Sequence, residues 1–341
     1  KPEIGASEDT WGTKINTDLD TLDTVVNAIG GKTAAATLSY ADAAKIATTA
    51  TGVDVTGTAV TDGLTVAGNL SADGGTIKLD GNYPVGTNNV ALGNLALSNG
   101  SLSGISNSAI GTQSLAGNTT GQNNVGLGTA SLYTNSTGQS NTSVGSNALF
   151  SNTTASNNTA VGFQAAYSNT TAPEVTAVGY KAGYNSTGGY NTFLGYNAGV
   201  GQTTGDGNTY IGRYAAGTAT ITGQNNSALG NRSLQAATSG SNNVSIGAES
   251  LKSNTTASNN VAVGYQAAYS NTTGERNTAM GVQSLYTNTT GSFNSAFGRA
   301  ALYYNTTGQQ NVANGQDALF SNTTGSYNVA IGKSALETNT T

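Results

Sequence analysis

Carboxylates are the side chains to consider first, because a glycosidase needs two of them about 5–10 Å apart. The C-terminal three quarters of the chain, residues 88–341, contain only six acids, and no two recur at the same place in neighbouring repeats: Glu174, Asp206, Glu249, Glu275, Asp317 and Glu337. The chain has no His and no Cys, which excludes Ser-His and Cys-His nucleophiles, zinc sites and disulfides. We therefore expect no enzyme activity, no cofactor and no metal site.

Two other patterns offer surface chemistry. Asn-x-Ser/Thr sequons match glycosylation acceptors, but they recur at one turn position, so we favour turn chemistry: Asn118, Asn152, Asn169, Asn254, Asn271, Asn288, Asn305 and Asn322. The neighbouring threonines suggest an ice-binding face only weakly. An aromatic stripe would suit sugar stacking, but packing between coils or chains is the favoured interpretation: Tyr133, Phe150, Tyr167, Tyr184, Tyr269, Tyr286, Tyr303 and Phe320.

The composition limits the elements that could carry these residues. Only 9% of the 341 residues are charged, against ~25% in ordinary globular proteins. A net charge of −5 and a sequence pI near 4.6 argue against nucleic-acid binding. No apolar run reaches the ~18 residues of a membrane helix, so we expect no membrane insertion.

A repeat of period 17 dominates residues 88–341. Its central glycine recurs at intervals of 16 to 18 residues, giving fifteen coils: Gly93, Gly111, Gly128, Gly145, Gly162, Gly179, Gly195, Gly212, Gly230, Gly247, Gly264, Gly281, Gly298, Gly315 and Gly332. Positions are numbered below from this glycine. Recurring Gly, Asn and Thr disfavour a helix, and stacked coils of one length would be about 4.8 Å apart. We predict an all-β repeat protein, a parallel β-solenoid or β-roll with two brief strands per coil.

Certain positions of the coil predict its core. Position −1 is apolar in fourteen of fifteen coils, position +3 is always Ala or Ser, and position −4 is Asn in fourteen. The predicted solenoid core takes residues from positions −1 and +3: Val161, Ala165, Val178, Ile246, Val263, Ala267 and Ile331. Large residues at position +1 often accompany small ones at position +4, as in Tyr265 and Ala268. We expect these two positions to share one packed site.

The first 87 residues follow no such repeat. Apolar residues spaced by three and four predict a helix that forms an oligomeric seam: Ile15, Leu19, Leu22, Val26 and Ile29. A second helix is expected around residues 40–49. The predicted domains are thus a helical attachment segment at 1–50, a β-rich connector at 51–87 and the solenoid at 88–341.

The coil sequence resembles a known family. Asn-Asn-Val-Ala-Val-Gly-Tyr-Gln-Ala at residues 259–267 is similar to the head repeat of trimeric autotransporter adhesins. That family forms a left-handed parallel β-roll in which three chains bury their inner faces against one another, although its coil is shorter than 17 residues. The resemblance implies a homotrimer and the same handedness.

A second resemblance concerns the N-terminal part of the chain. Ile-Gly-Ala-Ser-Glu-Asp-Thr-Trp-Gly-Thr-Lys-Ile at residues 4–15 looks like the start of bacteriophage tail-fibre proteins, and residues 47–66 are similar to their shafts. It implies a virion tail fibre whose N-terminus binds virion or baseplate proteins and whose surface attaches to a host glycan or protein. The alternative is a bacterial trimeric adhesin head at the cell surface.

Departures from the repeat cluster at residues 172–223, and such departures in solenoids tend to lie on a binding face. The candidate host contacts are Pro173, Glu174, Phe193, Tyr210, Thr220 and Ile221. The plainer interpretation, a coil sequence that has drifted without any contact role, is the favoured one.

Overall fold

The structure, a computed structural model, describes residues 87–217 and 219–341 together with the backbone of three N-terminal strands. The chain divides into two units, residues 1–77 and residues 78–341. The predicted seam at residues 15–29 and most of the predicted connector lie outside the described residues. The helical seam therefore stays a prediction.

The N-terminal unit contains a small antiparallel sheet in the order β1-β2-β3. Its strands are β1 Thr37–Tyr40, β2 Ala43–Thr49 and β3 Gly52–Val55. The helix expected around residues 40–49 is therefore wrong. Ile46, Thr48 and Thr49 are β-branched residues, which favour a strand once a neighbouring strand is available to pair with them.

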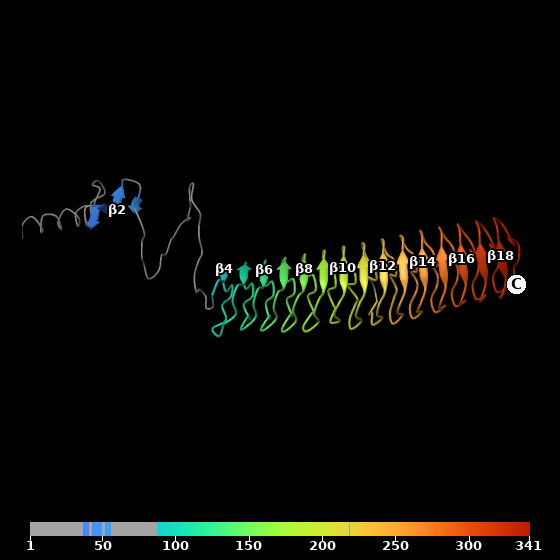
Figure 1. Cartoon of the computed structure of the whole chain (residues 1–341), viewed down its shortest axis with the longest axis horizontal. Helices are drawn as coiled ribbons and strands as arrows, with labels where there is room; N and C mark the ends of the chain where they lie inside the picture. The colour runs from blue at the N-terminus through green and yellow to red at the C-terminus, as the bar shows by residue number, and fades with distance from the viewer. Residues whose placement is uncertain (1–36, 41–42, 50–51, 56–86, 218) are drawn as a thin grey trace, which may run out of the picture. The chain divides into compact units, whose positions relative to one another are not determined.

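The second unit is a β-solenoid, and the predicted fold class is confirmed. Fifteen strands form one all-parallel sheet in which each strand between the two end strands pairs with those of the preceding and following coils (Figure 1). The strands are β4 Val90–Leu92, β5 Ser108–Ile110, β6 Val125–Leu127, β7 Thr142–Val144, β8 Thr159–Val161, β9 Thr176–Val178, β10 Thr192–Leu194, β11 Thr209–Ile211, β12 Ser227–Leu229, β13 Val244–Ile246, β14 Val261–Val263, β15 Thr278–Met280, β16 Ser295–Phe297, β17 Val312–Asn314 and β18 Val329–Ile331.

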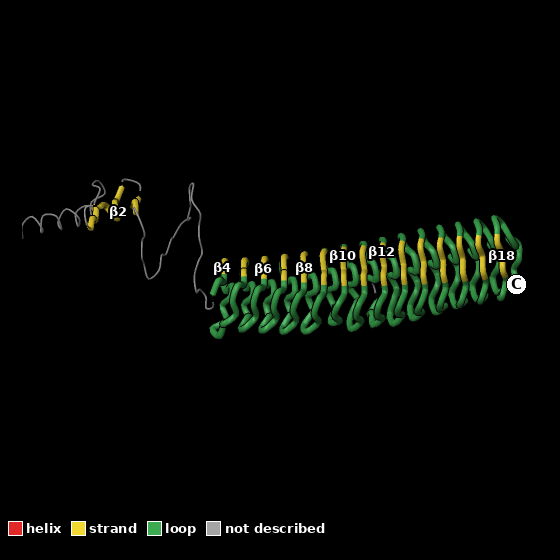
Figure 2. Tube along the Cα trace, in the orientation of Figure 1, coloured by secondary structure: helices red, strands yellow, loops and turns green. Residues whose placement is uncertain are grey.

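Each coil contributes one three-residue strand, at positions −3 to −1, and not the two strands that we expected. The rest of the coil is a return segment of turns (Figure 2). Its backbone still bonds to the next coil, as where Leu251 N donates to Ala267 O at 3.0 Å. The return segment does not extend because positions +2 and +4 adopt positive φ, for example 54° at Gln266 and 49° at Ala268.

The central glycine is required at every coil. Its φ lies between 119° and 144° in all fifteen coils, which is a region that L side chains rarely adopt. A Cβ placed on Gly264 would lie 2.6 Å from the carbonyl oxygen of Gly281 in the next coil. The close approach of two backbones therefore occurs at the glycine itself.

The interior of the solenoid is thin and is filled from positions −2, +3 and +4. Position −2, the middle of the strand, points inward and is most often Ala, as at Ala262 and Ala279. Position +3 is buried in the coils from Gly93 to Gly315, and position +4 is usually a fully buried Leu. The predicted core residues Ala165 and Ala267 are confirmed, since both are 0% exposed.

The prediction that residues at position −1 belong to the core is wrong. Val161, Val178 and Val263 are half-buried, whereas Ile246 and Ile331 are exposed on the outer face of the sheet. In a three-residue strand whose middle side chain points inward, the two flanking side chains must point outward. In the coils with Leu at position +4, the interior needs only a small residue at position −2, because the Leu side chain already fills it.

The predicted volume exchange between positions +1 and +4 is also wrong, because position +1 lies outside and position +4 inside. Tyr265, for example, is 49% exposed while Ala268 is buried. The exchange occurs between positions −2 and +4 instead. Phe193 at position −2 lies over Gly183 and Gly199 at position +4, where an added Cβ would contact its ring.

Two columns of asparagine carry hydrogen bonds from coil to coil. At position −4, Asn141 donates its backbone N–H to Asn124 Oδ1 at 3.0 Å, and its Nδ2 donates to Ala155 O at 2.9 Å. At position +7, Asn288 Nδ2 donates to Asn271 Oδ1 at 2.7 Å. These buried amides are hydrogen-bonded, as buried polar groups must be to avoid a large desolvation penalty.

Candidate functional surfaces

The outer face of the long sheet carries a column of apolar side chains that is interrupted at Asn314. Position −1 supplies residues that remain 38% to 72% exposed: Leu92, Ile110, Leu127, Leu194, Leu229, Ile246, Met280, Phe297 and Ile331. Beside them, position −3 is Thr, Ser or Val, and Val125 and Val329 are also exposed. An apolar face that recurs in fourteen of fifteen coils indicates an interaction surface.

The aromatic stripe at position +5 forms two stacked ladders. Tyr133, Phe150, Tyr167 and Tyr184 stack with ring centroids 5.1 Å apart and interplanar angles of 7° to 13°. Tyr269, Tyr286, Tyr303 and Phe320 stack likewise at 5.0 to 5.3 Å. Packing between coils, the favoured interpretation, is confirmed. A ring inside a ladder has both faces covered, so only the ends of a ladder can stack on a ligand.

A second, shorter aromatic column is more exposed. Phe163, Tyr180 and Tyr196 at position +1 stack at 5.5 and 5.1 Å and are 41% to 45% exposed. Tyr214 closes this column with an edge contact to Tyr196. Their rings also cover one another, so they present ring edges along the solenoid rather than flat faces.

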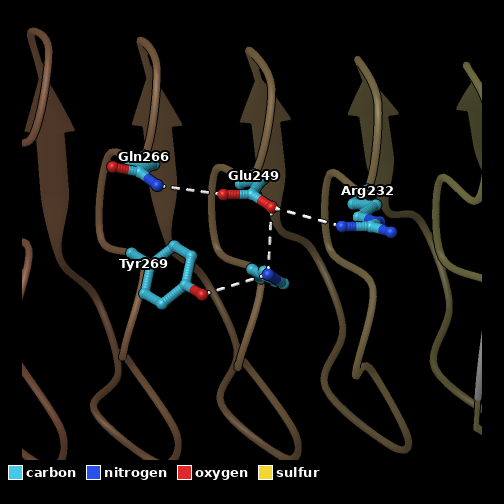
Figure 3. Close-up of polar contacts among 5 residues, drawn as sticks. Arg232, Glu249, Gln266 and Tyr269 are labelled. Carbon is cyan, nitrogen blue, oxygen red and sulfur yellow. Dashed lines mark hydrogen bonds and ion pairs between the residues drawn. The ribbon is translucent and has the colours of Figure 1, made fainter.

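A charged cluster lies at the start of the second ladder. Glu249 accepts hydrogen bonds from Gln266 at 2.9 Å and from Lys252 at 3.0 Å, and Arg232 lies 3.7 Å away on the preceding coil (Figure 3). Lys252 also donates to the Tyr269 hydroxyl at 3.0 Å. The hydrogen bond from Gln266, and then that from Lys252, lower the pKa of Glu249.

Glu249 therefore bridges neighbouring coils. It is an ionised carboxylate with partners on both sides along the axis, which suits a contact that ties coils together. Among residues 87–217 and 219–341, no cluster of His, Cys, Asp and Glu could hold a metal ion.

The predicted host contacts separate into two groups. Glu174 and Thr220 are exposed and Pro173 is half-buried. Phe193, Tyr210 and Ile221 are 0% exposed, so their prediction as contact residues is wrong. Phe193 and Tyr210 enter the interior because glycines and alanines at position +4 leave room there, and burial raises the pKa of Tyr210. Ile221 instead pairs with Gln202 of the preceding coil.

The sequon asparagines are also interior residues. All eight, from Asn118 to Asn322, are 0% exposed, and Asn118, Asn254 and Asn305 each donate to a turn carbonyl. A glycosyl transfer needs an accessible amide, so in the folded coil these residues serve the turn, as we favoured.

No protein-family model matches this chain, and neither the curated proteins nor the solved structures contain a match to it. Within the described part of the chain, no helix is both long and apolar enough to cross a membrane.

Proposed function

We propose that the chain is a structural fibre protein of a bacteriophage tail, a homotrimer that holds a host-attachment surface away from the virion. The observation that carries the proposal is the apolar column on the outer face of the sheet, which recurs along the stacked coils. A partner that covers the column along its whole length must repeat at the same axial spacing of about 4.8 Å. A second and a third copy of the chain have that spacing because they consist of the same stacked coils.

In this trimer the columns at positions −1 and −3 of three chains face one another. Fifteen coils at that spacing extend about 70 Å, so the assembly is a stiff spacer. Its function depends on its length, on its rigidity and on the display of the same surface three times. The similarity of residues 4–15 to tail-fibre N-termini supports attachment of that end to virion or baseplate proteins.

Light scattering on the purified chain tests the assembly. A homotrimer gives about three times the monomer mass of 33.9 kDa. The double variant Ile246→Lys, Val263→Lys carries both changes in every chain, so a trimer would place three copies of each charge in the interface, where unpaired charges are costly. This variant should give monomers or aggregates. A matched pair on the return segment, Thr256→Lys and Thr273→Lys, should leave the mass unchanged. A folded wild-type monomer would refute the trimer.

The second candidate, a bacterial adhesin head, rests on the similarity of the coils at residues 259–267 to adhesin head repeats. Antibodies against the solenoid separate the two proposals. In electron micrographs, gold label on the tails of purified phage particles supports the fibre, whereas label on the bacterial surface alone supports the adhesin.

A further inference from the structure

A hollow of about 430 Å³ lies at the N-terminal foot of the first aromatic ladder. It is lined by return-segment residues of three successive coils and by no strand residue: Leu95, Ser98, Gln113, Ala116, Gly117, Tyr133 and Thr134. Its size falls within the range of small-molecule sites, about 300–1,000 Å³. Because the lining comes from return segments, the strand columns of the proposed trimer contribute nothing to it.

Tyr133 presents a ring face to this hollow. Phe150 covers one face of the Tyr133 ring, with the centroids 5.1 Å apart and the planes 13° from parallel. The opposite face points along the solenoid axis toward the preceding coil, where position +5 is Ala116, and the coil before that has Ser98. The hollow therefore occupies the place where one or two further rings of the ladder would stand.

The two ladder ends that border the interruption between the stacks, at Tyr184 and Tyr269, differ from the end at Tyr133. Lys181 Nζ lies 5.2 Å from the ring centroid of Tyr184, and Lys252 Nζ lies 4.9 Å from that of Tyr269. Each of those rings already has a cation against it, which contributes a cation–π contact. The hollow beside Tyr133 has no charged side chain in its lining.

The lining is suited to an uncharged ring that is apolar on its faces and polar at its edges. An aromatic face attracts such a ring, and the Gln113 amide with the Ser98 and Thr134 hydroxyls can bond to hydroxyl groups at its rim. Thr134 already donates its hydroxyl to Phe150 O at 2.8 Å, so it acts toward a ligand as an acceptor.

We propose that this hollow binds a neutral hexopyranose unit, which stacks on Tyr133 in the place of the missing rung of the ladder. The inference rests on the fibre function proposed above only for the source of the sugar, a host surface glycan. Three copies in a homotrimer would strengthen the weak binding expected of a single shallow site.

Saturation-transfer NMR on the full chain tests the proposal with methyl α-D-glucopyranoside, methyl β-D-galactopyranoside and methyl α-D-mannopyranoside as probes. At least one probe should receive saturation and show a measurable Kd. Tyr133→Ala should weaken that Kd about tenfold through loss of the stacking face. Ala116→Tyr should abolish binding, because the new ring completes the ladder and fills the hollow.

Val200→Tyr is the matched control, since it adds a ring at position +5 beyond the opposite end of the same ladder. It should leave the Kd unchanged. Absence of saturation for all three probes, or equal Kd values for wild type and Ala116→Tyr, would overturn the proposal. Light scattering on the same samples reports the trimer separately, so a failed sugar site and a failed fibre assembly give different results.

Discussion

Two parts of the solenoid enclose the same interior with different side chains. In the regular coils, taken here as residues 245–341, position −2 is Ala or Ser and position +4 is Leu in all coils but one, where it is Ala268. In the departing coils, residues 172–223, Phe193 and Tyr210 stand at position −2 and Gly183, Gly199 and Ala216 at position +4. The strands pair in the same register in both parts. Volume is thus exchanged across the interior while the backbone path is kept.

The two parts also differ in their hydrogen-bonded columns. The position +7 column is Asn throughout the regular coils but Ser186 and Gln202 in the departing coils. At position −4, Val175 donates its backbone N–H to Asn158 Oδ1 at 2.8 Å but has no side-chain oxygen that could accept from the next coil. Departures from the consensus therefore alter how neighbouring coils are joined, and they alter the surface less than their sequence suggests.

The largest effect on stability is expected from removing a large side chain that fills the interior of the departing coils. Phe193→Ala leaves a cavity over two glycines and should lower the free energy of unfolding by about 3–5 kcal/mol. Gly199→Leu alone should also destabilise the chain, because its side chain meets the Phe193 ring. The double variant approaches the consensus coil and should recover part of the loss, as measured by denaturant unfolding. Additive losses in the two single variants would show that these positions do not share volume.

Breaking the asparagine column of the regular coils should cost nearly as much. Asn288 donates to Asn271 Oδ1 and Gly291 O and accepts from Asn305 Nδ2. Asn288→Ala removes three buried hydrogen bonds and should lower the free energy of unfolding by about 3 kcal/mol, at ~1 kcal/mol each. In the departing coils, Ser186→Ala removes the hydrogen bond from the Ser186 hydroxyl to Gly188 O and should cost about 1 kcal/mol. Equal midpoints in urea would contradict this difference.

Position +3 should behave alike in both parts, because it is Ala or Ser in the regular coils and Ala in the departing coils. Ala267→Leu and Ala198→Leu overpack a fully buried site and should each cost about 2 kcal/mol. The exposed turn variant Thr290→Leu should change the melting temperature little. A small loss of stability in Ala198→Leu together with a large loss in Ala267→Leu would show that the interior of the departing coils is more loosely packed.

The smallest effect concerns the Glu249 cluster, which lies between the departing coils and the second ladder. Its lowered pKa stabilises the folded chain at pH values above about 4.3, the ordinary pKa of Glu, and this contribution is lost as the pH falls through the folded value. Glu249→Gln should therefore cost about 0.5 kcal/mol at pH 7 and nothing near pH 2. Thermal unfolding across that pH range, with exposed Glu275→Gln as control, measures the difference.

The sequence alone was sufficient for the period, the parallel stacking and the buried small column that contains Ala165 and Ala267. These features follow from spacing, because equal coils must place equal residues in register. It also indicated that the sequon asparagines serve a turn. The aromatic stripe was readable as packing, because a ring at each coil lies at stacking distance from the next.

The direction of the side chains was decided only by the tertiary structure. Hydrophobicity suggested Ile246 and Val263 as interior residues, yet the smaller Ser245 and Ala262 point inward. A three-residue strand is too short for its alternation to reveal which face is buried, and the outcome depends on what the return segment supplies. Leu at position +4, held inward by a positive φ, leaves space for little more than a methyl group opposite. The same packing buries Phe193 and Tyr210 where Gly199 and Ala216 stand at position +4, because these small residues leave space that the strand side chain fills.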